Sequence, residues 1–354
     1  MRKWQSLLVC AAFLSFLFAT TSCESIYDGE QDCSTKIRFV FKKHRQALNA
    51  AFGKASDVFS STVGSVHVFI YDAETGKLVF EKYETTSNLK TESELNIGTG
   101  VERCYLTVNL EPGKYRVVAW CGLDNNDYNN AFFLSNGGTR AAYSECSVML
   151  SEQTGCPVNS EKYEALYHGA VNMVEVDANY PAVIPVELTK NTNDIAVWVQ
   201  HMSTTFSEGD YEVVYTDANG TMRFEDNAMV GNEVLEYHPY TTSLLDTSTE
   251  YNGSLVNAGA LVAHISTSRL METNKNDARL EVRDKQGNTV FSVPFIKYLL
   301  EMQTFTSDDQ YYLDCEDTYN CSFYLTGDNG LWMPAMIIIN NWVKVPDQVG
   351  GIGG

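Results

Sequence analysis

The sequence predicts an all-β protein built as two tandem antiparallel β-sandwich domains behind an N-terminal signal peptide. Nearly every periodic segment alternates apolar and polar residues with period two, which is the pattern of half-buried strands. Short segments of this kind are separated by turns that contain Gly or Pro, as in antiparallel sandwiches. The length of 354 residues corresponds to about two ordinary domains.

The composition excludes several other classes of protein. The chain has 45 acidic and 25 basic residues, whereas a nucleic-acid binder neutralises phosphates with clustered Lys and Arg, so we expect no nucleic acid as a partner. Hydrophobic residues make up 44% of the chain, which is enough to build packed cores and argues against disorder. Collagen-like and coiled-coil structures are excluded because neither a Gly repeat nor a heptad runs through the chain.

Residues 1–22 have the features of a lipoprotein signal peptide. Arg2 and Lys3 precede an apolar run, Leu7–Ala19, which is too short to cross a bilayer comfortably. The run ends in Thr20-Thr21-Ser22-Cys23, which resembles the lipobox of bacterial lipoproteins, where a cysteine behind small residues is acylated. Cys23 is therefore the expected lipidation site. The alternative is a plain secretory signal followed by a chance cysteine.

Residues 23–34 are expected to form an acidic linker behind the lipid. Four acidic residues resemble the stretch that marks lipoproteins of some Gram-negative bacteria for the outer face of the outer membrane: Glu24, Asp28, Glu30 and Asp32. Each buried methylene of an acyl chain contributes about 0.8 kcal/mol, so several chains hold a protein effectively permanently. We therefore expect a lipid-anchored protein on the cell surface, with the outer membrane as a partner.

The first sandwich is expected over residues 35–178. It opens with the strand Lys36–Phe41, whose alternate apolar residues share one face, and residues 46–59 have modest helical character. Two hairpins with Gly in their turns are predicted next. They pair Ser65–Tyr71 with Lys77–Tyr83, and Cys104–Leu110 with Tyr115–Trp120 around Pro112-Gly113.

The second sandwich is expected over residues 179–354, with the boundary near Asp177–Tyr180. Its first strand is the segment Ala182–Leu188. Two more strand–turn–strand segments are predicted, Asp210–Asp226 around Ala218-Asn219-Gly220 and Arg279–Phe295 around Gln286-Gly287-Asn288. The turns are similar because each one has to reverse the chain between two strands. They are not the repeating unit of a solenoid.

Seven cysteines remain behind Cys23, and an exported protein can form disulfides. A symmetric hairpin about Pro112-Gly113 would place Cys104 directly across from Cys121. Two further local pairs are Cys315 with Cys321, which flank a five-residue turn, and Cys146 with Cys156. Three disulfides and an unpaired Cys33 are therefore predicted, while the spacing leaves the connectivity open.

No motif of an enzyme, a metal site or a cofactor site is present. The six histidines are scattered, and zinc-hydrolase, Gly-x-Ser-x-Gly, phosphate-loop and Cys-x-x-Cys patterns are all missing. One acidic group offers carboxylates for glycoside hydrolysis or calcium, although in so acidic a chain a solvated loop is the simpler interpretation: Asp308, Asp309, Asp314, Glu316 and Asp317. We expect a protein that is not an enzyme and holds no metal or cofactor.

Twenty tyrosines leave a second function open, because aromatic rings at a surface can form a platform for sugars. Tyr is also a good strand residue, and Trp120 and Trp198 lie in alternating strands where a core position is the simpler interpretation. A glycan-binding surface lipoprotein of β-sandwich architecture is therefore the alternative function.

Six stretches in a fixed order carry a resemblance to a known family: Glu161–Val176, Pro185–Gln200, Tyr215–Tyr240, Ser266–Val282, Pro294–Glu301 and Tyr312–Val345. Together they resemble the FimB-type family of minor fimbrial subunits, lipoproteins that anchor or organise type V pili. The resemblance runs from Cys23 to about Pro346 and implies transthyretin-like sandwiches, a place in the fimbrium and other fimbrial subunits as partners. Asn341 and the pair Cys315 and Cys321 depart from the family pattern.

The candidate subunit-contact strand is the apolar run Met336-Ile337-Ile338-Ile339, together with Trp332 and Trp342. Pili of the resembling family are thought to grow by strand donation, in which main-chain hydrogen bonds supply affinity and alternate side chains fill pockets. Because the run is apolar on both faces, it must be covered on both, and an internal central strand is the alternative. The tethered opening strand, Lys36–Phe41, suggests a protein that terminates or nucleates the fibre at its base.

Overall fold

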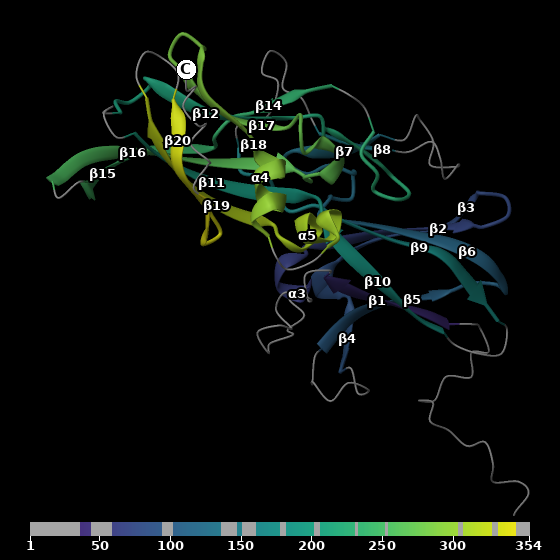
Figure 1. The fold of residues 1–354 in the computed structure, drawn as a ribbon. Helices are drawn as coiled ribbons and strands as arrows, with labels where there is room; N and C mark the ends of the chain where they lie inside the picture. The colour runs from purple at the N-terminus through teal and green to yellow at the C-terminus, as the bar shows by residue number, and fades with distance from the viewer. Residues whose placement is uncertain are drawn as a thin grey trace, which may run out of the picture.

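The computed structural model describes residues 36–43, 59–93, 102–135, 147–150, 161–177, 182–201, 206–230, 233–251, 254–303, 307–327 and 332–344. Most of them lie in β-strands, so the predicted all-β class is confirmed. Most strands from the first part of the chain gather in the lower right of Figure 1, and most strands from the second part gather in its upper half. None of the helices in these ranges has the length and apolar character needed to cross a membrane.

The N-terminal half is an eight-stranded sheet with the order β3-β2-β6-β9-β10-β1-β5-β4. Its strands are β1 (Lys36–Lys43), β2 (Ser65–Asp72), β3 (Leu78–Thr85), β4 (Lys90–Ser93), β5 (Glu102–Asn109), β6 (Gly113–Cys121), β9 (Tyr167–Val176) and β10 (Ala182–Lys190). Strands β9 and β10 pair only at Thr189 with His168 and at Lys190 with Tyr167. The two four-stranded parts enclose one core, to which Val68, Val117 and Val186 contribute.

The C-terminal half contains a six-stranded sheet, β15-β16-β11-β19-β20-β21, and a four-stranded sheet, β14-β12-β17-β18. Its strands are β11 (Thr192–His201), β12 (Tyr211–Asp217), β14 (Leu235–Tyr237), β15 (Thr241–Tyr251), β16 (Ser254–Ser268), β17 (Arg279–Asp284), β18 (Thr289–Pro294), β19 (Thr318–Thr326), β20 (Met333–Ile339) and β21 (Trp342–Lys344). Side chains of both sheets, such as Val197 and Leu280, share one core. The paired strands β15 and β16 extend outward as a ribbon at the left of Figure 1.

The two halves are joined by more than the chain between them. A three-stranded sheet, β13-β8-β7, combines β7 (Phe132–Ser135) and β8 (Ser147–Leu150) with β13 (Thr221–Arg223) from the second half. Phe69 and Trp120, on one face of β2 and β6, lie in the C-terminal core beside Phe224. Strands β2 and β6 are buried on both faces over much of their length. Each therefore contains a continuous apolar run, Val68–Tyr71 in β2 and Val117–Cys121 in β6.

The predicted boundary between residues 178 and 179 falls between two strands of the same N-terminal sheet. Strand β10, expected to open the second sandwich, pairs instead with β1 along its length. This pairing is parallel, as is that of β11 with β19, so the expectation of purely antiparallel sheets is wrong at these two places. Strand β10 ends in the N-terminal half, and β11 begins in the other half after the single residue Asn191.

Two of the four predicted hairpins are confirmed. Strands β2 and β3 pair around a turn in which Gly76 has φ 69°, and β17 and β18 pair around Gly287 with φ 81°. The other two hairpins are wrong. Strand β5 pairs with β1 and β4 while β6 pairs with β2 and β9, so Pro112-Gly113 carries the chain from one part of the sheet to another. Strand β12 pairs with β14 and β17, and β13 pairs with β8.

Short helices complete the fold. They are α3 (Phe59–Thr62), α4 (Phe295–Met302) and α5 (Asp309–Cys315), with 3-10 turns η1 (Thr86–Asn88) and η2 (Glu272–Asn274). The predicted helical stretch 46–59 lies outside the described residues except for Phe59, the first residue of α3. Helices α4 and α5 were not predicted, and each is too short for its 3.6-residue period to stand out from the surrounding strands.

Candidate functional site

The candidate contact strand occupies the outer part of the six-stranded sheet. Strand β20 pairs with β19 on one side and with the three-residue strand β21 on the other. Strand β21 covers only Ile337–Ile339, so the part Met333–Met336 of β20 has no further strand beside it in the described chain. We call β21 and Met333–Met336 the outer edge. A row of unpaired backbone groups at such an edge is a template for another strand.

The side chains of the outer edge divide into two groups. Ile337 and Ile339 are buried in the core, so this part of the run is an internal strand, as the alternative interpretation predicted. Met333, Trp342 and Val343 are instead among the most exposed large apolar side chains, with exposed fractions of 63%, 49% and 60%. The sequence-predicted residues Met336 and Ile338 are half-buried. The exposed apolar surface of the outer edge therefore lies at the two ends of the predicted run.

Trp332 does not belong to this surface. Its side chain is 9% exposed and packs against the rings of His201, Phe206 and Tyr211, with centroid distances of 4.7, 5.9 and 4.9 Å. Its backbone N–H donates to the carbonyl of Val290 at 2.8 Å. Placing Trp332 in a subunit contact was therefore wrong, because it fills the space between the two C-terminal sheets.

The turn between β20 and β21 explains one departure from the family pattern. Asn340 and Asn341 both have positive φ, 47° and 72°, which suits the two-residue turns of tight hairpins and favours Asn or Gly. The side-chain oxygen of Asn340 also accepts the backbone N–H of Asn320 at 2.8 Å. Lys344 fixes the end of β21 by an ion pair with Glu301 of α4. The outer edge is thus held in place by its own hairpin and by α4.

A second candidate site, which is polar, lies where β10 passes into β11. Arg269 binds Asp314 with two hydrogen bonds of 2.7 and 2.6 Å, and its remaining guanidinium nitrogen donates to the carbonyl of Asn227 at 3.0 Å. The side-chain amide of Asn227 donates to Asn191 at 2.7 Å, and Lys190 forms an ion pair with Asp317 at 3.3 Å. We call this group the junction: Lys190, Asn191, Asn227, Arg269, Asp314 and Asp317.

Several acidic residues that the sequence offered as a catalytic or calcium-binding group have structural partners in the fold. Asp314 and Asp317 pair with basic residues, and Asp308 accepts the backbone N–H of Tyr311 at 2.9 Å as the N-cap of α5. These side chains therefore point to different partners. Among the described residues, no group of His, Cys, Asp and Glu side chains is arranged to hold a metal ion.

A buried carbonyl group next to the junction joins three segments of the chain. Trp120 Nε1 donates to the carbonyl oxygen of Phe224 at 3.1 Å, and His168 Nε2 lies at 3.1 Å from the same oxygen. Burial lowers the pKa of His168 to about 3, although its hydrogen bond to Phe224 acts in the opposite direction. His168 is therefore neutral at pH 7, with Nε2 as its donor. Trp120 is fully buried, as the core interpretation predicted, whereas Trp198 is 39% exposed and the same interpretation is wrong for it.

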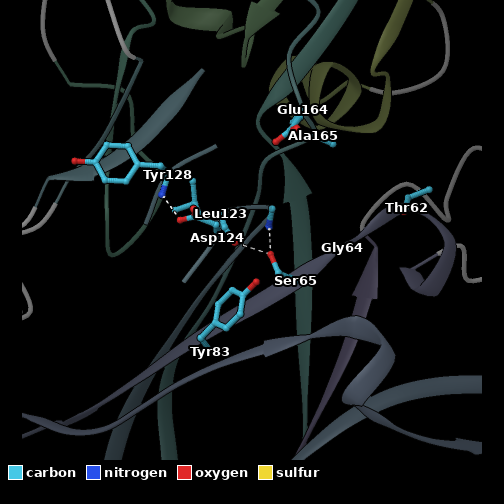
Figure 2. A pocket seen from close by; sticks show the side chains of 10 residues that line it. Thr62, Gly64, Ser65, Tyr83, Leu123, Asp124, Tyr128, Glu164 and Ala165 are labelled. Atoms are coloured by element: carbon cyan, nitrogen blue, oxygen red, sulfur yellow. Dashed lines mark hydrogen bonds between the residues drawn. The ribbon is translucent and has the colours of Figure 1, made fainter. Parts of the chain in front are cut away.

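An open hollow of about 400 Å³ lies at the end of the N-terminal sheet. Its lining includes Ser65, Tyr83, Asp124, Tyr128 and Glu164. Figure 2 shows the Tyr83 hydroxyl directed towards Ser65, while the ring of Tyr128 points away from Asp124. Ser65 donates to the carbonyl of Leu123 at 2.6 Å. The backbone N–H of Tyr128 holds the pKa of Asp124 below its usual value, so this carboxylate is ionised.

The two disulfides that can be checked are absent from the part of the chain that the structure describes. Cys121 and Cys321 are buried thiols, and burial raises the pKa of each. The pairing of Cys104 with Cys121 depended on a hairpin that does not form, because β5 and β6 are not neighbours. Cys315 ends α5 while Cys321 lies inside β19, so no five-residue hairpin turn joins them. Cys23, Cys33, Cys146 and Cys156 lie outside the described residues.

The chain matches the family model of fimbrillin-A associated anchor proteins Mfa1 and Mfa2 over residues 30–347. The chain belongs to this family. The FimB-type resemblance inferred from the sequence is thereby confirmed, and the protein is a fimbrial minor subunit. The family consists of fimbrial proteins and not of enzymes.

Solved structures show the same fold. A Bacteroides thetaiotaomicron protein described as a candidate adhesin is 25% identical with a TM-score of 0.69, over 89% of this chain and 99% of that one. A second protein from the same organism, described as a candidate polysaccharide-binding protein, is 22% identical with a TM-score of 0.67 and the same coverage. The fimbrial anchor protein Mfa2 of Porphyromonas gingivalis is 15% identical with a TM-score of 0.59, over 88% and 99%. A search of curated proteins found no match.

Proposed function

We propose that this fimbrial subunit is a surface lipoprotein that fixes the base of a fimbrium to the outer membrane through Cys23. The signal peptide with its lipobox-like end and the acidic linker support the membrane attachment. In this proposal the two halves correspond to transthyretin-like sandwiches, and the protein has no catalytic activity. Other fimbrial subunits are its protein partners.

We further propose that the next subunit binds the outer edge by adding a strand. The observation that carries this proposal is the shortness of β21. In the part of the chain that the structure describes, it leaves Met333–Met336 of β20 without a strand on that side, near exposed Trp342 and Val343. An added strand would satisfy the open backbone groups, and its side chains would cover the exposed apolar ones. Pro334 lies in the open part, which is the kind of position where a strand tolerates Pro.

The attachment is tested with Cys23→Ala in cells that assemble the fimbrium. We expect fimbriae to appear in the culture medium while the cell-bound fraction falls, and electron microscopy with fractionation measures both. Cys33→Ala is the matched control, because it removes a neighbouring cysteine outside the lipobox-like segment and should leave fimbriae attached. Fimbriae that remain on Cys23→Ala cells in wild-type amounts would contradict membrane attachment through this residue.

A second candidate function is glycan binding at the open hollow. Two tyrosines, Tyr83 and Tyr128, and two carboxylates, Asp124 and Glu164, line this hollow, and such a combination suits sugar rings and hydroxyl groups. A glycan array with wild type and Tyr128→Ala tests this function, with Tyr324→Ala on β19 as the control. Binding that is lost in Tyr128→Ala and kept in the control would support it. An array without any bound glycan would remove it.

A further inference from the structure

The tethered end of the chain enters the fold through β1, and this strand runs parallel to β10. The register extends from Ile37 beside Ala182 to Lys43 beside Leu188. The two strands therefore begin at the same end of the sheet and leave it at the opposite end. Strand β1 also pairs with β5 from Lys36 beside Asn109 to Val40 beside Tyr105, so it lies between two neighbours.

Strand β10 pairs with β1 on one of its sides, and its other side has little strand pairing in the described chain. Over Ala182–Leu188 its strand partner in the described chain is β1, because β9 pairs with β10 only at Thr189 and Lys190. Pro185 fits this placement, since a residue without a backbone N–H is tolerated where one side of a strand is unpaired. Val186 and Leu188 are fully buried in the N-terminal core, and this packing keeps β10 in register.

The far end of β10 leads directly into the C-terminal half. After Asn191 the chain continues as β11, an interior strand of the six-stranded sheet. From β11 the sheet proceeds through β19 and β20 to β21, which belongs to the outer edge. The junction ties the crossing point to the C-terminal half through Lys190 with Asp317 and Asn191 with Asn227. A continuous series of strands thus connects β1 to the outer edge.

We infer that the parallel pair β1 and β10 is a mechanical clamp that resists tension between the membrane and the fimbrium. This inference rests on the proposed function, in which the lipid pulls on the N-terminal end of β1 and the fimbrium pulls on the C-terminal half. The first force enters β1 at its beginning and the second leaves β10 at its end. The strands are therefore sheared along their length, and their inter-strand hydrogen bonds share the load.

The direction of loading decides how long such a pair survives. If the same strands were pulled apart from one end, their hydrogen bonds would open one after another, and each single bond is weak. In shear, several bonds must be stretched before any strand is released. Lifetime under force depends on the unfolding rate, so a higher barrier appears directly as a longer lifetime.

Single-molecule force measurements on the full mature chain test the clamp by changing the direction of pulling. One handle replaces the lipid at residue 23, and the second is attached through Val343→Cys for shear or Val183→Cys for opening from one end. These attachment sites are matched, because Val343 and Val183 are 60% and 61% exposed. Val183 pairs near the beginning of β1, beside Arg38.

We expect the shear arrangement to survive at least about tenfold longer at the same constant force, which corresponds to about 1.4 kcal/mol in the barrier. Its first rupture should release a length of chain that begins at β1. Equal lifetimes in the two directions, or a first rupture within the C-terminal half, would overturn the inference. This measurement uses purified protein, whereas the Cys23→Ala test uses cells. Equal lifetimes together with detached fimbriae would reject the clamp and keep the membrane attachment. A long lifetime in shear together with fimbriae that stay attached would reject the membrane attachment and keep the mechanical property of the strand pair.

Discussion

The junction and the outer edge are built from opposite kinds of residue. At the junction, Arg269 and Asp314 are nearly enclosed, with side-chain exposures of 12% and 11%, and they make paired hydrogen bonds. At the outer edge, Trp342 and Val343 are apolar and half or more exposed. Polar groups have been buried where the two halves meet, and apolar groups have been left in solvent at one side of one sheet.

This difference shows that the junction stabilises the folded chain, whereas the apolar surface of the outer edge gains free energy only when another surface covers it. Buried charges are tolerated only when each has its partner, so the junction contributes to the folded state as a unit and fails as a unit. Exposed apolar side chains contribute little to folding, and their burial becomes favourable when another surface covers them. We therefore expect changes at the junction to alter stability, and changes at the outer edge to alter assembly.

The largest effect is expected from Asp314→Ala. This change leaves the Arg269 guanidinium buried without its carboxylate, and it also removes the acceptor of a hydrogen bond from Gln310 at 2.9 Å. Breaking one side of a buried pair typically costs about 3–5 kcal/mol in the free energy of unfolding. Urea unfolding of wild type and variant, followed by fluorescence, measures this loss.

The control for this prediction is Arg223→Ala. Arg223 pairs with Asp226, but the two side chains are 46% and 45% exposed, and such surface pairs contribute little. The midpoint of urea unfolding should therefore stay where it is in wild type. If Asp314→Ala lowered stability by no more than Arg223→Ala does, the junction would not be the structural unit described here.

A smaller effect, which depends on pH, is expected at His168. Burial lowers its pKa to about 3 in the folded protein, whereas an unfolded histidine titrates near about 6.5. Between these values the unfolded chain binds a proton that the folded chain does not, so the contribution of His168 is complete above pH 6.5 and is lost as the pH falls. The loss should amount to about 1.4 kcal/mol per pH unit within this window.

His168→Gln isolates this contribution, because Gln can still donate to the Phe224 carbonyl but does not titrate. The stability difference between wild type and variant should shrink as the pH falls below 6.5, while all other titrating groups cancel. Urea unfolding at several values between pH 4 and pH 8 measures the difference. A difference that stays constant across this range would show that His168 takes up its proton without leaving the fold.

The comparison also shows what the sequence could and could not predict. Period-two alternation correctly indicated strands such as Lys77–Tyr83 and Arg279–Asp284, because that pattern depends only on local burial. Pro112-Gly113 correctly indicated a turn, yet β5 and β6 separate into different pairings. A turn residue fixes where the chain changes direction, whereas the partner of a strand is decided by packing across the whole sheet. The predicted disulfide of Cys104 with Cys121 failed for this reason.

The junction could not be found from single residues for a related physical reason. Arg269, Asp314 and Lys190 are ordinary charged residues in the sequence, and only the fold brings them together over separations such as 45 and 127 residues. The family-like stretches Pro185–Gln200 and Ser266–Val282 were a usable signal, because they contain Lys190, Asn191 and Arg269. At the outer edge the sequence indicated the run Met336–Ile339, of which Ile337 and Ile339 are buried, and it missed the exposed neighbours Met333 and Val343.

The smallest effect on stability, but a large one on assembly, is expected from Trp342→Thr. Thr suits a strand and the side chain is 49% exposed, so the unfolding free energy should change by no more than about 1 kcal/mol. Capture of other fimbrial subunits from solubilised cell envelope, quantified by mass spectrometry, should fall, because a large apolar contact of the added strand is lost. Leu244→Thr, on the opposite edge strand β15 of the same sheet, is the control. If both variants reduced capture equally, the outer edge would have no special role. A partner that adds a strand beside Met333–Met336 gains nothing from a residue on the opposite side of the sheet.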